Sequence, residues 1–399
     1  MLYLCMILFN RILNIRNLSK SCFILGPRQT GKTTLVNGCL KDTPHLRIDL
    51  LQYQEFIRYA QNLGQFRKEV SSGIESSKFN TVVVDEIQKL PALLDEIHSL
   101  LEQYQGRIKF VLTGSSARKL KRQGVNLLAG RAWMFHLFPL THLEIGDLLD
   151  LDKILRYGSL PQVLQESPEE ARLTLEAYTN TYLKEEIAQE ALVRNLGQFN
   201  RFLELASFES GNIINYTTLS REIGLSSNAI KGYYQILEDT LLSHTVPPFV
   251  KTIRKRMTKH PKIYFFDCGI TNAFTRRLSA ELVIGSQLYG KLFEHFIVLE
   301  LFRLIAYSHR EIRISYLRLH SGLEIDLILE EEEHLIAIEI KSGSAPHGAE
   351  AKNLINFGKE FPKAKLYLVC TTPRSYKIDS VQVIPWKDLF IHLNLVPKV

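Results

Sequence analysis

The residues best suited to chemistry form one stretch near the amino terminus, Gly26-Pro27-Arg28-Gln29-Thr30-Gly31-Lys32-Thr33-Thr34. The stretch fits the pattern G-x-x-x-x-G-K-[ST], in which the glycines let the backbone fold into a nest of N–H groups around phosphate oxygens. Lys32 is expected to contact the β- and γ-phosphates of a nucleotide, and the Thr33 hydroxyl is expected to ligate Mg²⁺. The stretch therefore predicts a binding site for ATP and Mg²⁺.

Two carboxylates follow a β-branched run, Thr81-Val82-Val83-Val84, at Asp85 and Glu86. Asp85 would hold Mg²⁺ through its water shell, and Glu86 would polarise the water that attacks the γ-phosphate. A surface strand that happens to end in two acids is the alternative explanation. The phosphate-binding loop upstream favours the catalytic one.

A third apolar run, at residues 109–112, ends in Thr113-Gly114-Ser115-Ser116. Ser115 is expected to contact the γ-phosphate or the lytic water. An ordinary turn between a strand and a loop explains the same small residues nearly as well.

The elements that must position these residues are short strands alternating with helices. Residues 22–25 predict a buried strand before the loop, and residues 33–40 predict a helix whose N-terminus adds partial positive charge at the phosphates. Alternation of this kind over residues 1–150 predicts a parallel sheet with helices on both faces. Further elements are expected at residues 47–50 (a strand), 91–104 (a helix) and 135–140 (the last strand of the sheet).

Size and composition limit the class of protein. A chain of 399 residues is long for one hydrophobic core, so two or three domains are expected. The net charge of +7 permits a polyanionic partner. The five cysteines are scattered without a C-x-x-C pair, which argues against zinc sites and disulfides and predicts a cytoplasmic protein. The apolar start, residues 1–9, is too short to span a membrane and predicts a helix packed on the first domain.

Taken together, these motifs resemble a family of prokaryotic AAA+-type ATPases fused to a C-terminal domain of unknown function. The motifs that carry the resemblance lie at residues 26–33, 85–88, 113–116, 128–131 and 138–140. The resemblance implies that Arg131 faces a nucleotide, either in its own site or in that of a neighbour in an oligomer. From chemistry alone, Arg131 could equally be a surface arginine. Residues 158–161, 178–187 and 264–269 also resemble segments of this family, and we assign no chemistry to them.

Residues 213–245 predict a helix-turn-helix. A short amphipathic helix at residues 217–223 precedes a turn at residues 224–227 and a longer helix at residues 228–242. The second helix would present Ser227, Asn228, Lys231 and Gln235 to a DNA major groove. A lid or a protein-binding module is the alternative role for such a domain.

A basic run follows at residues 251–262, with seven Lys, Arg or His positions and no acid. Such a run would attract the phosphate backbone of DNA without sequence preference. A solvated basic loop is the alternative.

The carboxyl-terminal block resembles the core of the PD-(D/E)xK nucleases. Glu294 lies on a predicted helix, Asp326 on a predicted strand, and Glu339 and Lys341 on the returning strand. In that arrangement Asp326 and Glu339 would converge on one Mg²⁺, and Lys341 would steady a nucleophilic water. A hairpin with charged residues on its solvated face is the alternative, and nuclease-like folds are often kept for binding.

The sequence thus predicts an α/β protein with a P-loop NTPase sheet, a winged helix-turn-helix and a nuclease-like C-terminal domain. The expected boundaries are 1–150 for the ATPase domain, 151–212 for a helical lid, 213–284 for the winged helix and 285–399 for the nuclease-like domain. The expected function is ATP hydrolysis with Mg²⁺, in which Lys32 and Arg131 stabilise the transferred phosphoryl group and nucleotide state controls a DNA-facing C-terminal half. The alternatives are a nucleotide-switched module that binds a protein partner and an ATP-regulated, Mg²⁺-dependent DNA nuclease. No membrane contact is expected.

Overall fold

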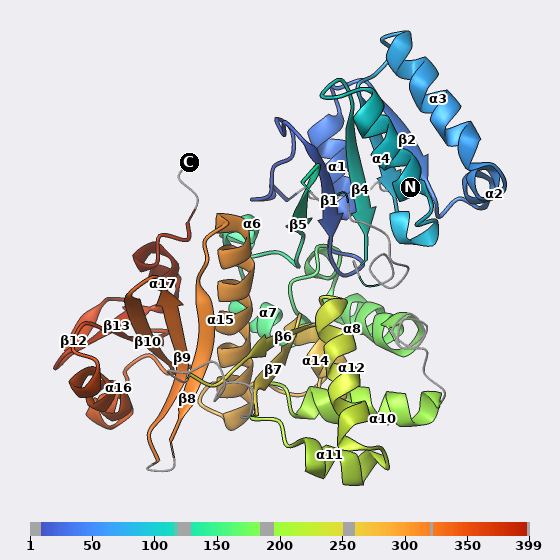
Figure 1. The fold of residues 1–399 in the computed structure, drawn as a ribbon. Helices are drawn as coiled ribbons and strands as arrows, with labels where there is room; N and C mark the ends of the chain where they lie inside the picture. Colours follow the sequence, from blue (N-terminus) through green and yellow to red (C-terminus); the bar gives the residue numbers. More distant parts are fainter. Residues whose placement is uncertain are drawn as a thin grey trace. The chain divides into compact units, whose positions relative to one another are not determined.

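The computed structural model describes residues 9–115, 118, 128, 130–183, 195–249, 260–319 and 322–396. The chain forms two compact units, drawn in Figure 1. The first comprises residues 8–140 and 239–242, and the second comprises residues 141–238 and 243–399. The helix predicted for residues 1–9 and most of the basic run, residues 251–259, lie outside the described residues.

A parallel five-stranded sheet forms the centre of the first unit. Its strands are β1 (Ser21–Leu25), β2 (His45–Asp49), β3 (Thr81–Asp85), β4 (Lys109–Gly114) and β5 (Ala132–His136). They lie in the order β2-β3-β4-β1-β5, and every neighbouring pair is parallel. All the carboxyl ends therefore lie at one edge of the sheet, where open α/β sheets bind their ligands. The predicted parallel sheet is confirmed.

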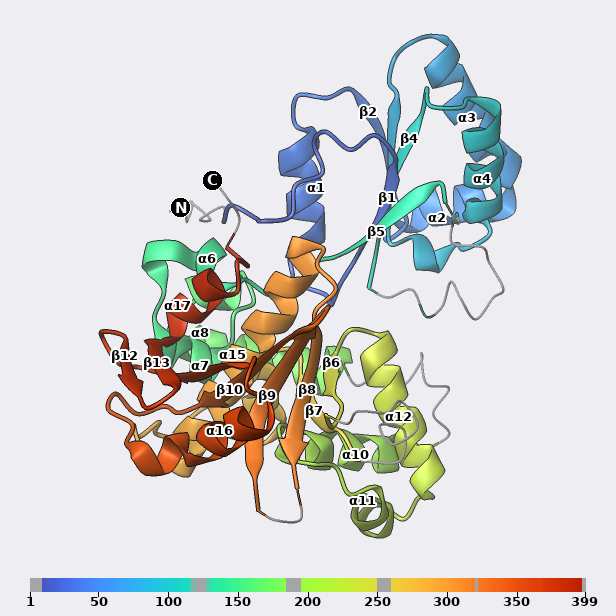
Figure 2. The same cartoon turned by 60° about the vertical axis from the view of Figure 1, so that its left-hand side comes forward.

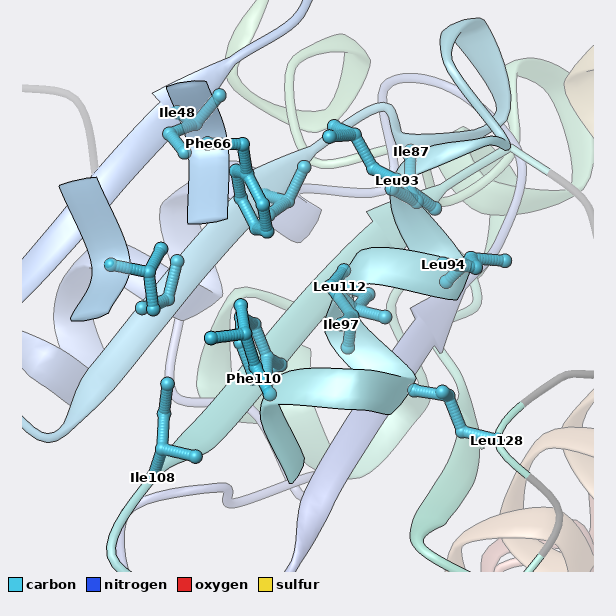
Figure 3. Close-up of a cluster of buried hydrophobic side chains, with 14 of the residues drawn as sticks. Ile48, Phe66, Ile87, Leu93, Leu94, Ile97, Ile108, Phe110, Leu112 and Leu128 are labelled. Carbon is cyan, nitrogen blue, oxygen red and sulfur yellow. The ribbon is translucent and has the colours of Figure 1, made fainter. Parts of the chain in front are cut away.

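Helices cover both faces of this sheet. They are α1 (Lys32–Leu40), α2 (Tyr53–Gln61), α3 (Leu63–Glu75), the 3-10 turn η1 (Ile87–Lys89) and α4 (Leu93–Gln103). Figure 2 shows α1 on one side of the sheet and α3 and α4 on the other. Phe66 of α3 and Ile97 of α4 pack with Phe110 of β4 in the buried core shown in Figure 3. Strands buried on both faces explain why β1, β3 and β4 read as continuous apolar runs.

The last strand of the sheet starts three residues and ends four residues earlier than predicted. We expected it at residues 135–140, but β5 ends at His136. The Leu137 N–H still donates to the Leu25 carbonyl over 2.7 Å. Pairing does not continue to residue 140, because Pro139 has no N–H to donate to a ladder.

The second unit contains an antiparallel pair of strands, β6 (Ser243–Val246) and β7 (Lys262–Phe265), and a six-stranded sheet. The strands of that sheet are β8 (Arg313–Arg318), β9 (Glu324–Glu331), β10 (His334–Ile340), β11 (Lys365–Cys370), β12 (Tyr376–Ile378) and β13 (Val381–Pro385). They lie in the order β12-β13-β11-β10-β9-β8.

The α-helices of this unit are α6 (His142–Ile145), α7 (Leu151–Tyr157), α8 (Pro168–Ala177), α10 (Leu196–Phe208), α11 (Tyr216–Ile223), α12 (Ser227–Asp239), α14 (Cys268–Phe274), α15 (Gln287–Ser308), α16 (Gly348–Glu360) and α17 (Trp386–His392). Short 3-10 turns lie at η2 (Gly146–Leu148) and η3 (Val163–Gln165), and a π-helix lies at Tyr178–Leu183.

Two segments to which the sequence assigned no chemistry, residues 158–161 and 264–269, meet inside the second unit. The Asp267 carboxylate accepts the Ser159 N–H over 2.8 Å and the Gly269 N–H over 2.9 Å. A Cβ on Gly158 would lie 1.8 Å from Asp267 Oδ1, and Gly158 also has a left-handed φ of +76°. Buried Arg303 donates to the Ser159 hydroxyl over 2.9 Å. These residues therefore hold α7, α14 and α15 together. Their resemblance to family segments is explained by this structural role, without any chemical role.

Candidate functional site

The backbone of the loop at residues 26–31 requires its two glycines. Gly31 adopts a left-handed φ of 90° directly before α1. A Cβ on Gly26 would lie 2.1 Å from the Leu137 carbonyl oxygen, and the Gly26 N–H donates to the Gly114 carbonyl over 3.2 Å. The loop is thus held between β4 and the end of β5, at the carboxyl edge of the sheet.

Lys32 is the first residue of α1 and is buried within the loop. Its ammonium donates to the carbonyl oxygens of Gly26 over 2.7 Å and of Pro27 over 3.0 Å. The Thr30 hydroxyl also donates to Pro27, over 2.8 Å. A cation and a helix N-terminus at one point favour an anion such as a phosphate.

Thr33 and Asp85 meet although 52 residues separate them in the chain. The Thr33 hydroxyl donates to Asp85 Oδ2 over 2.9 Å, and the Asp85 carboxylate is buried. A hydroxyl and a carboxylate are the hard oxygen donors that Mg²⁺ takes together with waters and substrate phosphates. Among the described residues, no group of three or more His, Cys, Asp or Glu is arranged to hold a metal. An Mg²⁺ ion bound together with a nucleotide takes most of its ligands from phosphates and waters, so it needs few protein ligands. Thr33 and Asp85 therefore fit Mg²⁺.

Glu86 lies directly beside them in a left-handed backbone conformation, with φ 59°. Its N–H donates to the Thr113 hydroxyl over 3.2 Å. The Gln88 amide on η1 donates to the Glu86 carboxylate and, over 3.1 Å, to the Ser115 hydroxyl. Gln88 thus links Glu86 with Ser115. The left-handed backbone of Glu86 fits a functional site, because this conformation costs a non-glycine residue about 1–3 kcal/mol and such residues cluster at functional sites.

Two further residues of the site were missed from the sequence. Arg47 on β2 contacts Asp85 Oδ2 over 3.0 Å and also donates to Asn37 on α1. The Thr113 hydroxyl on β4 donates to Asp85 Oδ1. For Thr113 the signal was present, because it directly follows an apolar run predicted to be a strand of the same sheet as the Asp85 strand. An arginine inside a short strand such as β2 gives no comparable signal.

Arg131 lies at the opposite edge of the sheet. It directly precedes β5, whose Ala132 pairs with Ser21, the first residue of β1. The loop follows Leu25 at the far end of β1, and five residues at about 3.3 Å each separate the two edges by roughly 16 Å. In the structure Arg131 pairs instead with Glu102 over 2.8 Å. This position argues against a role for Arg131 in its own site, and it leaves two expectations open: a role in the site of a neighbouring copy, or a surface arginine.

The four residues predicted from the nuclease pattern, Glu294, Asp326, Glu339 and Lys341, lie in the second unit. The Lys341 ammonium donates to Glu339 Oε1 over 2.6 Å, and Asp326 Oδ2 accepts the Ile340 N–H over 2.8 Å. Burial, followed by the nearby charges of Glu294 and Glu339, raises the pKa of Asp326 well above its usual range. The four residues predicted from the nuclease pattern are therefore neighbours in space.

Lys262 and Tyr264 of β7 join these four residues. The sequence analysis had placed Lys262 in the basic run expected to attract DNA, but Lys262 is buried and its ammonium pairs with Glu294, so it does not present its charge to a phosphate backbone. Lys262 Nζ lies 3.3 Å from Glu294 Oε1, and the Tyr264 hydroxyl donates to the same oxygen over 2.6 Å. Burial acts to lower the pKa of Lys262, but the charges of Glu294 and Asp326 outweigh it and raise that pKa. An adjoining pocket of about 340 Å³ is lined by Lys262, Lys291, Glu294, Arg318, Glu324 and Asp326, with residues 210–213.

The region predicted as a helix-turn-helix contains α11, a left-handed Gly224 with φ 75°, and α12. Asn215 caps α11 by accepting the N–H groups of Thr217 and Thr218. Of the four residues predicted to face a groove, Asn228, Lys231 and Gln235 are exposed and Ser227 is half-buried.

Comparison with known proteins shows three family matches along the chain. Residues 18–146 match a family described as an AAA domain. Residues 148–281 match "Domain of unknown function (DUF8612)", and residues 289–389 match "Domain of unknown function (DUF4143)". The first unit is thus similar to AAA-type ATPase domains, as its loop and sheet predicted.

Individual relatives are similar to most of the chain. An uncharacterized protein of Mycobacterium tuberculosis is 26% identical over 326 residues, which are 81% of this chain and 70% of the relative. An uncharacterized protein of Haemophilus influenzae is 21% identical over 391 residues, which are 90% of this chain and 92% of the relative. Among solved structures, a Walker-type ATPase of Pyrococcus abyssi is 16% identical with a TM-score of 0.43, over 63% of this chain and 90% of that one.

None of the helices in the described part of the chain combines the length and the apolar character needed to cross a membrane.

Proposed function

We propose that the first unit hydrolyses ATP at the loop of residues 26–34 and that nucleotide state controls a DNA-contacting second unit. The observation that carries the ATPase proposal is the 2.9 Å contact between the Thr33 hydroxyl and the Asp85 carboxylate. Thr33 on α1 and Asp85 at the end of β3 would both ligate Mg²⁺, and they lie next to Lys32 at the edge where a parallel sheet binds ligands.

Each residue of the site has a distinct task in this proposal. The loop N–H groups and the α1 N-terminus bind the phosphates, and Lys32 leaves its loop carbonyls to contact the β- and γ-phosphates. Thr33 and Asp85 hold Mg²⁺, which when bound neutralises charge on the phosphates. Glu86 orients and polarises the attacking water, because its carboxylate lies beside the metal ligands. Arg131 would stabilise the transferred phosphoryl group of a neighbouring copy, so the proposal includes an oligomer.

The proposed DNA contact rests on α11 and α12, read as a winged helix-turn-helix with β6 and β7 as its wing. Exposed Asn228, Lys231 and Gln235 on one helix supply donors for base edges and a cation for phosphates. The described end of the basic run adds the exposed His260, two residues before β7. A module that binds a protein partner would use the same exposed helix, so the test must distinguish the two.

The test is the binding of fluorescent duplex DNA, measured by anisotropy at several salt concentrations, with and without ATP and Mg²⁺. We expect the affinity to fall steeply with salt and to change when ATP is added, because phosphate contacts release counterions. Thr33→Ala should remove the effect of ATP and leave basal DNA binding intact. A flat salt dependence would instead support the protein-partner module.

Nuclease activity was the other alternative drawn from the sequence. Glu294, Asp326, Glu339 and Lys341 supply the residue types for it. Among the described residues, however, no group of three or more His, Cys, Asp or Glu is arranged to hold a metal. We therefore do not include DNA cleavage in the proposed function.

A further inference from the structure

The acidic cluster of the second unit consists of Glu294, Glu324, Asp326 and Glu339. In a nuclease-like fold such carboxylates would surround a divalent cation. Here three of them contact a cation of the chain itself: Glu294 contacts Lys262, Glu324 contacts Arg318 over 3.8 Å, and Glu339 contacts Lys341. The fourth, Asp326, accepts a backbone N–H.

Lys262 is the unexpected member of this set. Its side chain is only 4% exposed, and its ammonium lies 5.6 Å from the centre of the Tyr316 ring. A buried ammonium needs a paired charge, which Glu294 supplies at 3.3 Å. Lys262 therefore has a fixed position facing the cluster.

One oxygen of the cluster shows that the pairing is incomplete. Glu339 is 7% exposed, and its Oε2 is buried without a hydrogen-bond partner among the residues that the structure describes. A buried carboxylate oxygen without a donor costs free energy, so it marks a point where a cation or a donor would bind favourably. The cluster thus has a donor oxygen for a metal but is already balanced by the chain's own cations.

We propose that the Lys262 ammonium stands in the place of a divalent cation in the acidic cluster and prevents Mg²⁺ or Mn²⁺ from binding there. A divalent ion entering beside Glu294 would meet a positive charge a few ångströms away. The two positive charges would repel each other, and this repulsion lowers the affinity of the cluster for the ion.

The blocking residue and the cluster come from different parts of the chain. Lys262 belongs to β7, inside the segment that matches one family of unknown function, and all four acids of the cluster lie in the segment that matches the other. The acidic cluster is therefore closed by a neighbouring segment, and this closure does not depend on the ATPase proposal.

The experiment uses Tb³⁺ luminescence, sensitised by the nearby tyrosines Tyr264 and Tyr316, on the full chain without nucleotide. Three proteins are measured: wild type, Lys262→Met and Lys291→Met. Each is compared with the same protein carrying Asp326→Asn in addition, and the difference in luminescence between the two reports Tb³⁺ bound at the cluster. Lys291→Met is the matched control, because Lys291 lines the same pocket but its ammonium contacts Asn212 over 3.4 Å. Circular dichroism establishes that each variant is folded.

We expect no Asp326-dependent signal in wild type or Lys291→Met. Lys262→Met should show one, at Tb³⁺ concentrations at least about tenfold below the highest concentration at which wild type shows none, because one opposing charge has been removed. An Asp326-dependent signal in wild type would overturn the proposal, and so would a folded Lys262→Met without one. If Lys262→Met does not fold, the comparison of wild type with Asp326→Asn decides. Equal Tb³⁺ luminescence in these two proteins supports the proposal, and a stronger signal in wild type overturns it.

Discussion

Replacing Gln88 with alanine removes the amide that holds the proposed catalytic carboxylate. Gln88 is 7% exposed, and its Nε2 donates to both Glu86 and Ser115. A hydrogen bond to a charged group contributes about 1.5–3 kcal/mol. If that energy orients Glu86 in the transition state, kcat should fall roughly 10- to 100-fold. KM should change little, because Gln88 acts on Glu86 and not on the phosphate-binding loop.

A substitution at Gly114 should also disturb the position of the Gln88 amide. A Cβ on Gly114 would lie 2.5 Å from Gln88 Oε1, which is the flexible end of that side chain. Gly114→Ala should therefore displace the Gln88 amide while the protein stays folded, and kcat should fall to a similar degree. Once Gln88 has been replaced by alanine, Gly114→Ala should cost little more, so the two effects should not add.

The assay is steady-state phosphate release from ATP by the two single variants, the double variant and Gln103→Ala. Gln103 is an exposed glutamine of the same unit and serves as the control. Wild-type kcat in Gln88→Ala, or additive losses in the double variant, would refute the claim that Gln88 positions Glu86.

Three further outcomes are expected. Lys231→Ala should weaken DNA binding about equally for all sequences and reduce the salt slope by about 1, as measured by anisotropy; an unchanged slope would remove Lys231 from the interface. Burial lowers the pKa of His295 to about 4, and its Nε2 donates to a backbone carbonyl over 2.6 Å. Because the unfolded pKa is about 6.5, the stabilisation is complete above that pH and is lost as pH falls toward 4, to an extent of about 3 kcal/mol. His295→Gln should flatten this loss in urea unfolding between pH 7 and 4.5, whereas an unchanged pH dependence would exclude His295 as its source. Gly158→Ala should destabilise the chain by about 1–3 kcal/mol, because its Cβ would collide with Asp267, while Gly232→Ala, which faces open space, should not; equal unfolding midpoints would contradict the clash.

The sequence predicted the elements around the ATP site because their signals are local. The apolar runs of β1, β3 and β4 required burial on both faces, and the glycine pattern required a phosphate-binding loop. Parallel strands then carry their carboxyl ends to one edge, so Thr33 and Asp85 were expected to meet, and they lie 2.9 Å apart. The same rule could have placed Arg131 correctly, since a residue that precedes a parallel strand lies at the amino edge.

The remaining contacts depend on information that no short stretch contains. Gln88 reaches Ser115 because η1 turns back over the end of β4. Lys262 reaches Glu294 because β7 packs beside α15, 32 residues away in the chain. Lysine and glutamine in such positions look like ordinary polar residues of a strand or turn, so only the three-dimensional packing identifies them.

The central claim is that this chain hydrolyses ATP with Thr33, Asp85 and Glu86 at the carboxyl edge of the first sheet. Phosphate release from ATP with Mg²⁺, measured for wild type and Glu86→Gln alongside the binding of a fluorescent ATP analogue, tests it most directly. We expect wild type to hydrolyse ATP, and we expect Glu86→Gln to lose turnover while it retains nucleotide affinity. Equal turnover in the two proteins, or wild type that neither binds nor hydrolyses ATP, would contradict it.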